Sequence, residues 1–90
     1  MEKIIKVEDV FKTQKEIDSW YDGLIKGIKM GIGSVIQDVG VNSFIDNYSS
    51  LYASSIAGFN NMKRDYYQRV LHKSPESYIT LDDILKDLTK

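Results

Sequence analysis

Residues 23–58 read GLIKGIKMGIGSVIQDVGVNSFIDNYSSLYASSIAG, in which a Gly-Val-Asn sequence at residues 40–42 separates two runs with a small residue at every fourth position. The small residues are Gly23, Gly27 and Gly31 in the first run and Ser50, Ser54 and Gly58 in the second. Because residues four apart lie on the same face of a helix, each run would present a strip of minimal side chains. We therefore predict an antiparallel hairpin of two helices that pack closely along these strips.

The first arm of the hairpin is predicted to span residues 14–39. Thr13 and Glu16 have the spacing of a capping box, which marks the start of a helix. Gly40 is typical of a helix end, where it would adopt the left-handed conformation of a Schellman motif. Between these limits apolar residues recur three and four positions apart, which is heptad spacing.

The second arm is predicted to span residues 43–72. Ser43 and Asp46 have the spacing of a second capping box. The arm should end before Pro75, because proline disfavours helix at the residue that precedes it. Heptad spacing continues through the arm, and its seam includes Tyr48, Tyr52 and Tyr66.

Glycines inside the arms leave two possible breaks, at Gly31–Gly33 and at Gly58. Each internal glycine lowers helix propensity by about 1 kcal/mol relative to alanine. A break at either place would fold the chain into a compact four-helix bundle. The heptad spacing passes through both places without a slip, so we expect continuous or kinked arms that form a rod.

Two shorter segments flank the hairpin. Residues 1–12 are assigned to an N-terminal arm that could be helical or extended. Residues 80–89 are predicted to form a short amphipathic helix, which Thr80 and Asp83 open with a third capping box. The whole chain, residues 1–90, is thus predicted to be a single all-α domain.

Composition limits the possible functions. The net charge of −1 predicts no general attraction to nucleic acid or to anionic membranes. The chain has no cysteine, which excludes disulfides, thiolate metal sites and thiol nucleophiles. The most apolar window is interrupted by lysines and is too short to span a bilayer. Because Met1–Lys6 lacks the features of a secretory signal, we expect a cytoplasmic location.

The hairpin is predicted to leave apolar surface for a partner. The apolar face of the first arm widens to roughly 160°, which is more than one antiparallel neighbour can cover. The residues that widen it are Ile25, Ile32, Ile36 and Val39. The seam tyrosines suit a core and a partly wet interface equally well. Residues 80–89 would either close over the hairpin or dock on a partner. The predicted partner interface comprises Ile25, Ile32, Ile36, Tyr48, Tyr52, Tyr66, Leu81, Ile84, Leu85 and Leu88.

These patterns favour a function in binding. We expect a non-catalytic protein-binding module that self-associates and acts as a regulator, an inhibitor or an assembly factor, for a partner that the sequence does not define. A rod of this kind also fits a structural subunit of a virion or of a secretion apparatus.

Cations beside tyrosines suggest a small-ligand binder as a further alternative. Such side chains can hold phosphates and stack on bases, although cations near a helix C-terminus also complement the helix dipole. The predicted anionic-ligand site, for a metabolite or a nucleotide, comprises Lys63, Arg64, Tyr67 and Arg69. The sequence contains no acid–base pair, metal cluster or activated nucleophile, so we expect neither an enzyme nor a cofactor.

Overall fold

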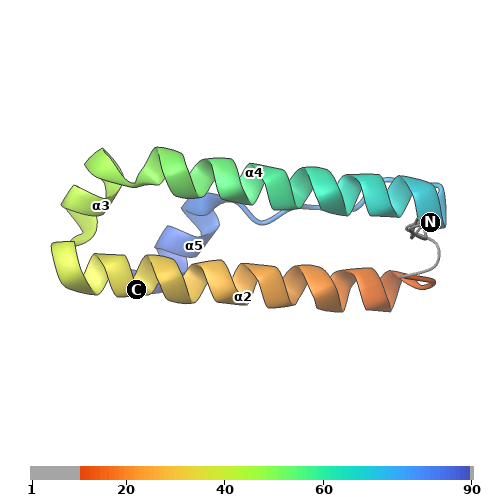
Figure 1. Ribbon diagram of the computed structural model, residues 1–90, viewed down its shortest axis with the longest axis horizontal. Coiled ribbons are helices and arrows are strands. Elements are labelled where there is room, and N and C mark those ends of the chain that lie inside the picture. Colours follow the sequence, from red (N-terminus) through yellow and green to blue (C-terminus); the bar gives the residue numbers. More distant parts are fainter. Residues whose placement is uncertain (1–10, 90) are drawn as a thin grey trace, which may run out of the picture.

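The computed structural model describes residues 11–89, and the described chain is all-α (Figure 1). Two long helices, α2 and α4, lie antiparallel, and a short helix, α3, turns the chain between them (Figure 1). The elements are α2 (Gln14–Val39), α3 (Val41–Asn47), α4 (Ser49–Tyr66), the π-helical turn η1 (Tyr67–Leu71) and α5 (Leu81–Leu88). The predicted hairpin with a short C-terminal helix is confirmed. Most of the predicted N-terminal arm, residues 1–10, lies outside the described residues.

The first arm forms as one uninterrupted helix of 26 residues. At its start the Thr13 hydroxyl accepts a hydrogen bond from the Glu16 N–H at 3.2 Å. The Glu16 carboxylate accepts from the Lys12 N–H at 3.3 Å, one residue before the predicted capping-box partner. The alternative of a break at Gly31–Gly33 is therefore wrong, and the expected continuous arm is present.

The hinge is a single residue, Gly40, with φ +89° and ψ 160°. Glycine is needed there because a side chain rarely tolerates a positive φ. The ψ value lies outside the left-handed helical region, so the predicted Schellman motif does not form. Helix α3 begins at Val41 without a side-chain cap, and the predicted capping box of Ser43 and Asp46 is therefore wrong.

The second arm breaks at Tyr48, where φ is −123° and ψ is −17°, and it passes through Gly58 without interruption. The break lets α3 turn across the end of the hairpin and bury Phe44 completely. The Phe44 ring lies 5.5 Å from the ring of Tyr52 and 6.4 Å from that of Tyr48. The arm ends at His72, whose left-handed conformation stops the π-helical turn.

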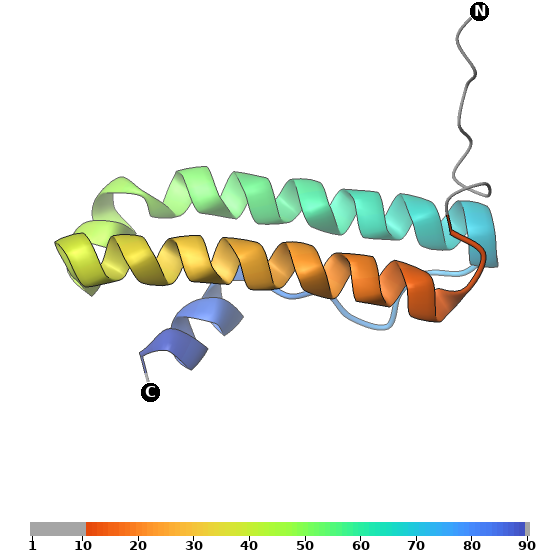
Figure 2. The same ribbon diagram turned by 60° about the horizontal axis from the view of Figure 1, so that its bottom comes forward.

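Helix α5 packs across one face of the hairpin (Figure 2). Its Ile84 joins Ile32, Phe44 and Ile56 in a core whose members are at most 3% exposed. The predicted capping box of Thr80 and Asp83 is present. The structure thus shows the closed arrangement, in which the C-terminal helix covers the wide apolar arc of α2.

The glycine strip does not mediate close packing of the two arms, contrary to the prediction. A Cβ atom built on Gly23, Gly27 or Gly58 would meet no atom within 4 Å outside its own surroundings in the helix. A Cβ on Gly31 would lie 4.0 Å from a ring carbon of Tyr52, which is an ordinary contact. Gly23, Gly27 and Gly58 are exposed, so they face solvent rather than the other arm. The molecule is elongated, but its extents of 45, 34 and 17 Å along the principal axes describe a flattened shape rather than the expected rod.

Candidate functional site

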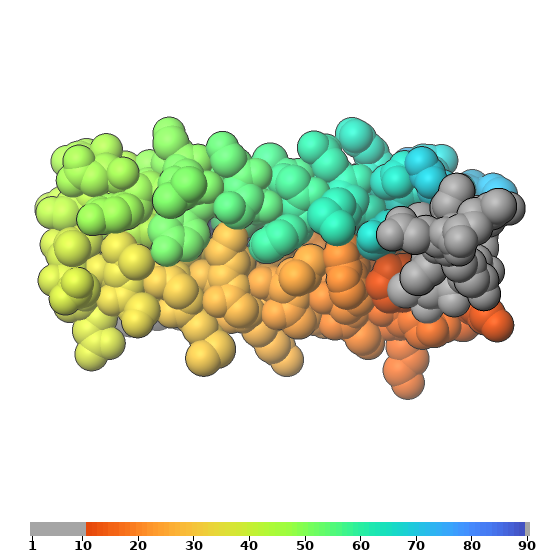
Figure 3. Space-filling view, in the orientation of Figure 1, coloured from red at the N-terminus to blue at the C-terminus, as the bar shows by residue number. Residues whose placement is uncertain are grey.

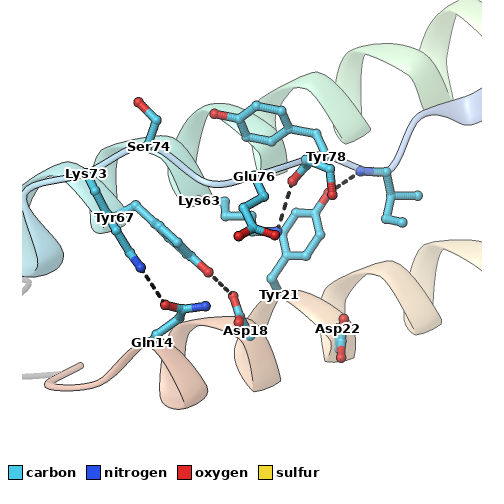
Figure 4. A pocket seen from close by; sticks show the side chains of 12 residues that line it. Gln14, Asp18, Tyr21, Asp22, Lys63, Tyr67, Lys73, Ser74, Glu76 and Tyr78 are labelled. Atoms are coloured by element: carbon cyan, nitrogen blue, oxygen red, sulfur yellow. Dashed lines mark hydrogen bonds between the residues drawn. The ribbon is translucent and has the colours of Figure 1, made fainter.

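A cleft of about 330 Å³ lies between the start of α2, the end of α4 and the loop of residues 72–80 (Figure 4). Tyr21, Tyr67 and Tyr78 line it, and we call it the tyrosine cleft. In Figure 4 the Tyr67 hydroxyl points across the cleft to Asp18, to which it donates a hydrogen bond. The cleft is thus bounded by α2, by α4 with its π-helical turn, and by the loop.

Tyr21 fastens the loop to the hairpin. Its hydroxyl donates to the side-chain oxygen of Asn60 and accepts from the N–H of Ile79 at 3.0 Å. The Asn60 amide nitrogen in turn donates to the carbonyl oxygen of Ile79 at 3.0 Å. We call this closed network of Tyr21, Asn60 and Ile79 the Tyr21 clamp. It holds the chain just before α5 and so positions that helix on the core.

Lys63 occupies the aromatic part of the cleft. Its ammonium group lies 4.2 Å from the ring centroid of Tyr21, 5.8 Å from that of Tyr67 and 5.9 Å from that of Tyr78. It also donates to the carbonyl oxygen of Ser77 at 3.2 Å. Cations within about 6 Å of an aromatic face are attracted to it. This lysine therefore stabilises the loop rather than projecting toward solvent.

Both tyrosines on the hairpin side of the cleft favour their neutral form. Burial raises the pKa of Tyr67 to about 12, and its hydrogen bond to Asp18 and the charge of that carboxylate act in the same direction. Burial also raises the pKa of Tyr21, while the hydrogen bond from Ile79 partly opposes the shift. Each hydroxyl thus keeps the proton that it donates.

The predicted anionic-ligand site is not assembled. Lys63 and Tyr67 come together in the tyrosine cleft, but Arg64 is exposed and does not line it. The Arg69 guanidinium instead lies 3.2 Å from Asp65 on the same helical face. The cleft contains three carboxylates, from Asp18, Asp22 and Glu76, against the two amines of Lys63 and Lys73. Its charges therefore disfavour an anion.

A second region lies on the face of the hairpin opposite α5 (Figure 3). The rings of Trp20 on α2 and Tyr66 on α4 meet there at 5.0 Å, and Gly31 faces Tyr52 further along. From these contacts, steps of three and four residues trace one strip along each helix. The strips comprise Trp20, Leu24, Gly27, Gly31 and Ser34 on α2 and Tyr48, Tyr52, Ser55, Phe59, Met62 and Tyr66 on α4. We call this surface the open face.

Neither strip of the open face carries a charged side chain, and the large residues of both strips are aromatic or apolar. On α4, Met62 is 40% exposed, Tyr48 is 36% exposed, and Leu51 at the edge of the strip is 65% exposed. At one end Phe11 packs on the rings of Trp20, at 5.6 Å, and Tyr66. Contiguous apolar surface of this kind marks sites of interaction more often than scattered apolar residues do.

No match to this chain was found among family models, curated proteins or solved structures. Within residues 11–89, no helix has both the length and the apolar character that crossing a membrane requires. The same residues contain no group of three or more histidine or acidic side chains that could hold a metal ion.

The structure divides the predicted partner interface between the core and the open face. Ile32 and Ile84 are buried, so they cannot meet a partner in this conformation. Their neighbours on α2 and α5 pack against that core, namely Ile25, Ile36, Leu81, Leu85 and Leu88. Tyr48, Tyr52 and Tyr66 lie on the open face, although Tyr52 also packs against the core.

Sequence reasoning grouped Phe59 and Met62 with the seam tyrosines of the second arm, but it missed that Trp20 and Leu24 form a strip beside them. The signal was present, because the same spacing of three and four residues runs through them, one step around each helix from the residues of the core.

Proposed function

We propose that this protein is a non-catalytic protein-binding module that binds through the open face and acts as a regulator, an inhibitor or an assembly factor. One observation carries the proposal: the hairpin presents two uncharged strips side by side, with large apolar side chains exposed along α4. The proposal includes a cytoplasmic location, which fractionation of the source cells would test.

The residue types of the open face support protein binding. Tryptophan, tyrosine, phenylalanine and methionine are enriched at protein interfaces, whereas lysine and the acidic residues are depleted from their centres. Trp20 and Tyr66 have the side chains that most often dominate binding energy, and their mutual packing holds them in place. Burial of apolar area contributes about 25 cal/mol per Å², so covering exposed Leu51 and Met62 would favour association.

Two methionines provide a matched test. Met62 lies on the open face and is 40% exposed, whereas Met30 is 77% exposed and lies outside both strips. A Met62→Glu variant places a charge within the binding surface, where it must lose water without gaining a partner. Met30→Glu introduces the same chemical change on a surface that we expect to remain solvated.

The three tagged proteins would be used for quantitative affinity capture from an extract of the source cells. We expect the same specific proteins to be retained by the wild type and by Met30→Glu and to be lost with Met62→Glu. Circular dichroism would verify that both variants remain helical. Retention of the same proteins by Met62→Glu would contradict the proposed role of the open face.

A further inference from the structure

We infer that the partner of the open face is a second copy of this chain, which packs open face to open face to form a four-helix bundle. This inference rests on the proposed function and names the partner for the same surface. It starts from the exposed apolar side chains of α4, including Leu51 and Met62, which one hairpin leaves in water.

The shape of the open face is complementary to itself. Along α2 the middle of the strip is small, with Gly27, Gly31 and Ser34. We call the part of the strip with these three small residues the hollow. Gly31 faces Tyr52, so the hollow lies level with the bulky part of α4 around Leu51. A second copy turned about the long axis of the hairpin would place its α4 over α2 of the first. The bulky part of each copy would then meet the hollow of the other, so that the same contact occurs twice, as a two-fold interface requires.

The same arrangement gives a regular helical packing. Helices α2 and α4 run antiparallel within one copy (Figure 1). After the turn about the long axis, each α2 is antiparallel to both of its neighbours, as in an up-and-down four-helix bundle. Because the strips carry no charge, no like charges oppose each other at the contact. The hollow would let the two backbones approach, since a Cβ at Gly27 meets nothing within 4 Å.

The size of the open face sets the expected affinity. The α2 strip from Trp20 to Ser34 spans 14 steps, or about 21 Å at 1.5 Å per residue. Two helices about 10 Å apart make a surface roughly 20 Å wide, which gives a footprint of about 400 Å² per copy. That is below the roughly 800 Å² per partner of a standard stable interface, so we expect a weak dimer that forms only at high protein concentration.

Sedimentation equilibrium between about 10 and about 500 μM tests the inference. We expect the wild type and Met30→Glu to pass from monomer to dimer over this range. Gly27→Glu should remain monomeric, because its carboxylate would lie in the hollow that the partner's α4 fills. This variant should still fold, since glutamate is a better helix former than glycine and its Cβ has free space. Circular dichroism would verify its helix content.

Two further measurements examine the chemistry of the contact. Leu51→Ala should weaken the dimer by about tenfold or more, since the leucine would be buried in both halves of the interface. Raising the salt concentration from about 0.1 M to about 1 M should leave the Kd within about twofold or strengthen the dimer, because no ion pairs form the contact.

A wild-type monomer at about 500 μM would overturn the inference. So would a dimer that Gly27→Glu leaves unchanged. These outcomes are separate from failure of the proposed function. A monomer whose Met62→Glu variant loses its captured proteins would assign the open face to a different protein, whereas retention by that variant would refute the open face as a binding site.

Discussion

Replacing Tyr21 with phenylalanine removes one hydroxyl from the Tyr21 clamp while keeping the buried ring, which is 2% exposed. The hydroxyl donates to Asn60 and accepts from the N–H of Ile79. Loss of the first bond removes about 1 kcal/mol. Leaving the part-buried N–H of Ile79 without an acceptor costs about 1–3 kcal/mol more. We therefore expect Tyr21→Phe to lower the free energy of unfolding by about 2–4 kcal/mol.

Equilibrium unfolding in urea, followed by far-ultraviolet circular dichroism, measures this loss. The control is Tyr48→Phe, which removes a hydroxyl group from an exposed tyrosine outside the clamp. It should change the free energy of unfolding by less than about 0.5 kcal/mol. A double-mutant cycle with Asn60→Ala should give a coupling energy of about 0.5–3 kcal/mol. Amide exchange in α5 should also become faster, because the clamp holds the chain that leads into it.

The reasoning about the clamp would be refuted by a loss of less than about 0.5 kcal/mol for Tyr21→Phe. Additive effects of Tyr21→Phe and Asn60→Ala would equally refute it, because the two side chains would then not act as one network.

Three further substitutions examine the core, the glycine strip and the cleft. Ile84→Ala should destabilise the protein by about 2–5 kcal/mol in the same urea assay, since it leaves a cavity beside Ile32; an effect below about 1 kcal/mol would mean that α5 is not part of the core. Gly23→Ala should raise stability by about 0.5–1 kcal/mol in a thermal melt, because a methyl group there meets no atom within 4 Å. A loss of stability would instead indicate that the two arms pack closely at Gly23, contrary to the structure. For Tyr67, the pKa in the folded state is raised to about 12 from the ordinary value of 10.0, so its contribution to stability is complete below about pH 10 and is lost as the pH rises through about 12. Urea midpoints between about pH 9 and about pH 12 should therefore fall more steeply for the wild type than for Tyr67→Phe; parallel pH profiles would show that Tyr67 is not held in its neutral form.

Local patterns in the sequence predicted the elements that depend on local physics. The Thr13 cap and Gly40 indicated the observed bounds of α2, and the spacing of Thr80 and Asp83 indicated the start of α5. Gly40 was predicted to make the hinge, and its positive φ explains why glycine is needed. The break at Tyr48 had no such signal. It follows from the burial of Phe44 against the rest of the fold, which no local pattern encodes.

Periodicity shows which residues share a face of a helix, but not which neighbour covers that face. Ile32 was assigned to a partner interface because the sequence does not show that Ile84 of α5 packs on it. Gly27 looked like a close contact between the arms, yet a Cβ atom there would meet no atom within 4 Å. The Tyr21 clamp joins residues that are 19 to 58 positions apart, so it was outside the reach of pattern analysis.

Lys63 illustrates the same limit at the candidate site. Its position near the C-terminal end of α4 is typical of a cation that complements the helix dipole. In the structure its ammonium group instead lies over the ring of Tyr21, 42 positions earlier in the chain, and contacts the loop at Ser77. Cations and tyrosines that are neighbours in sequence therefore indicated an anion site, whereas the fold uses one of those cations to hold its own loop.

Two-dimensional ¹H–¹⁵N NMR spectra of the labelled wild type, recorded from about 20 μM to about 500 μM, test most directly whether the open face is the site of association. We predict that concentration-dependent shifts gather at the amides of Gly27, Gly31, Ser55 and Met62 and at the indole N–H of Trp20, while α5 stays unchanged. Shifts confined to α5 or to the tyrosine cleft, or spectra that do not change with concentration, would contradict the account.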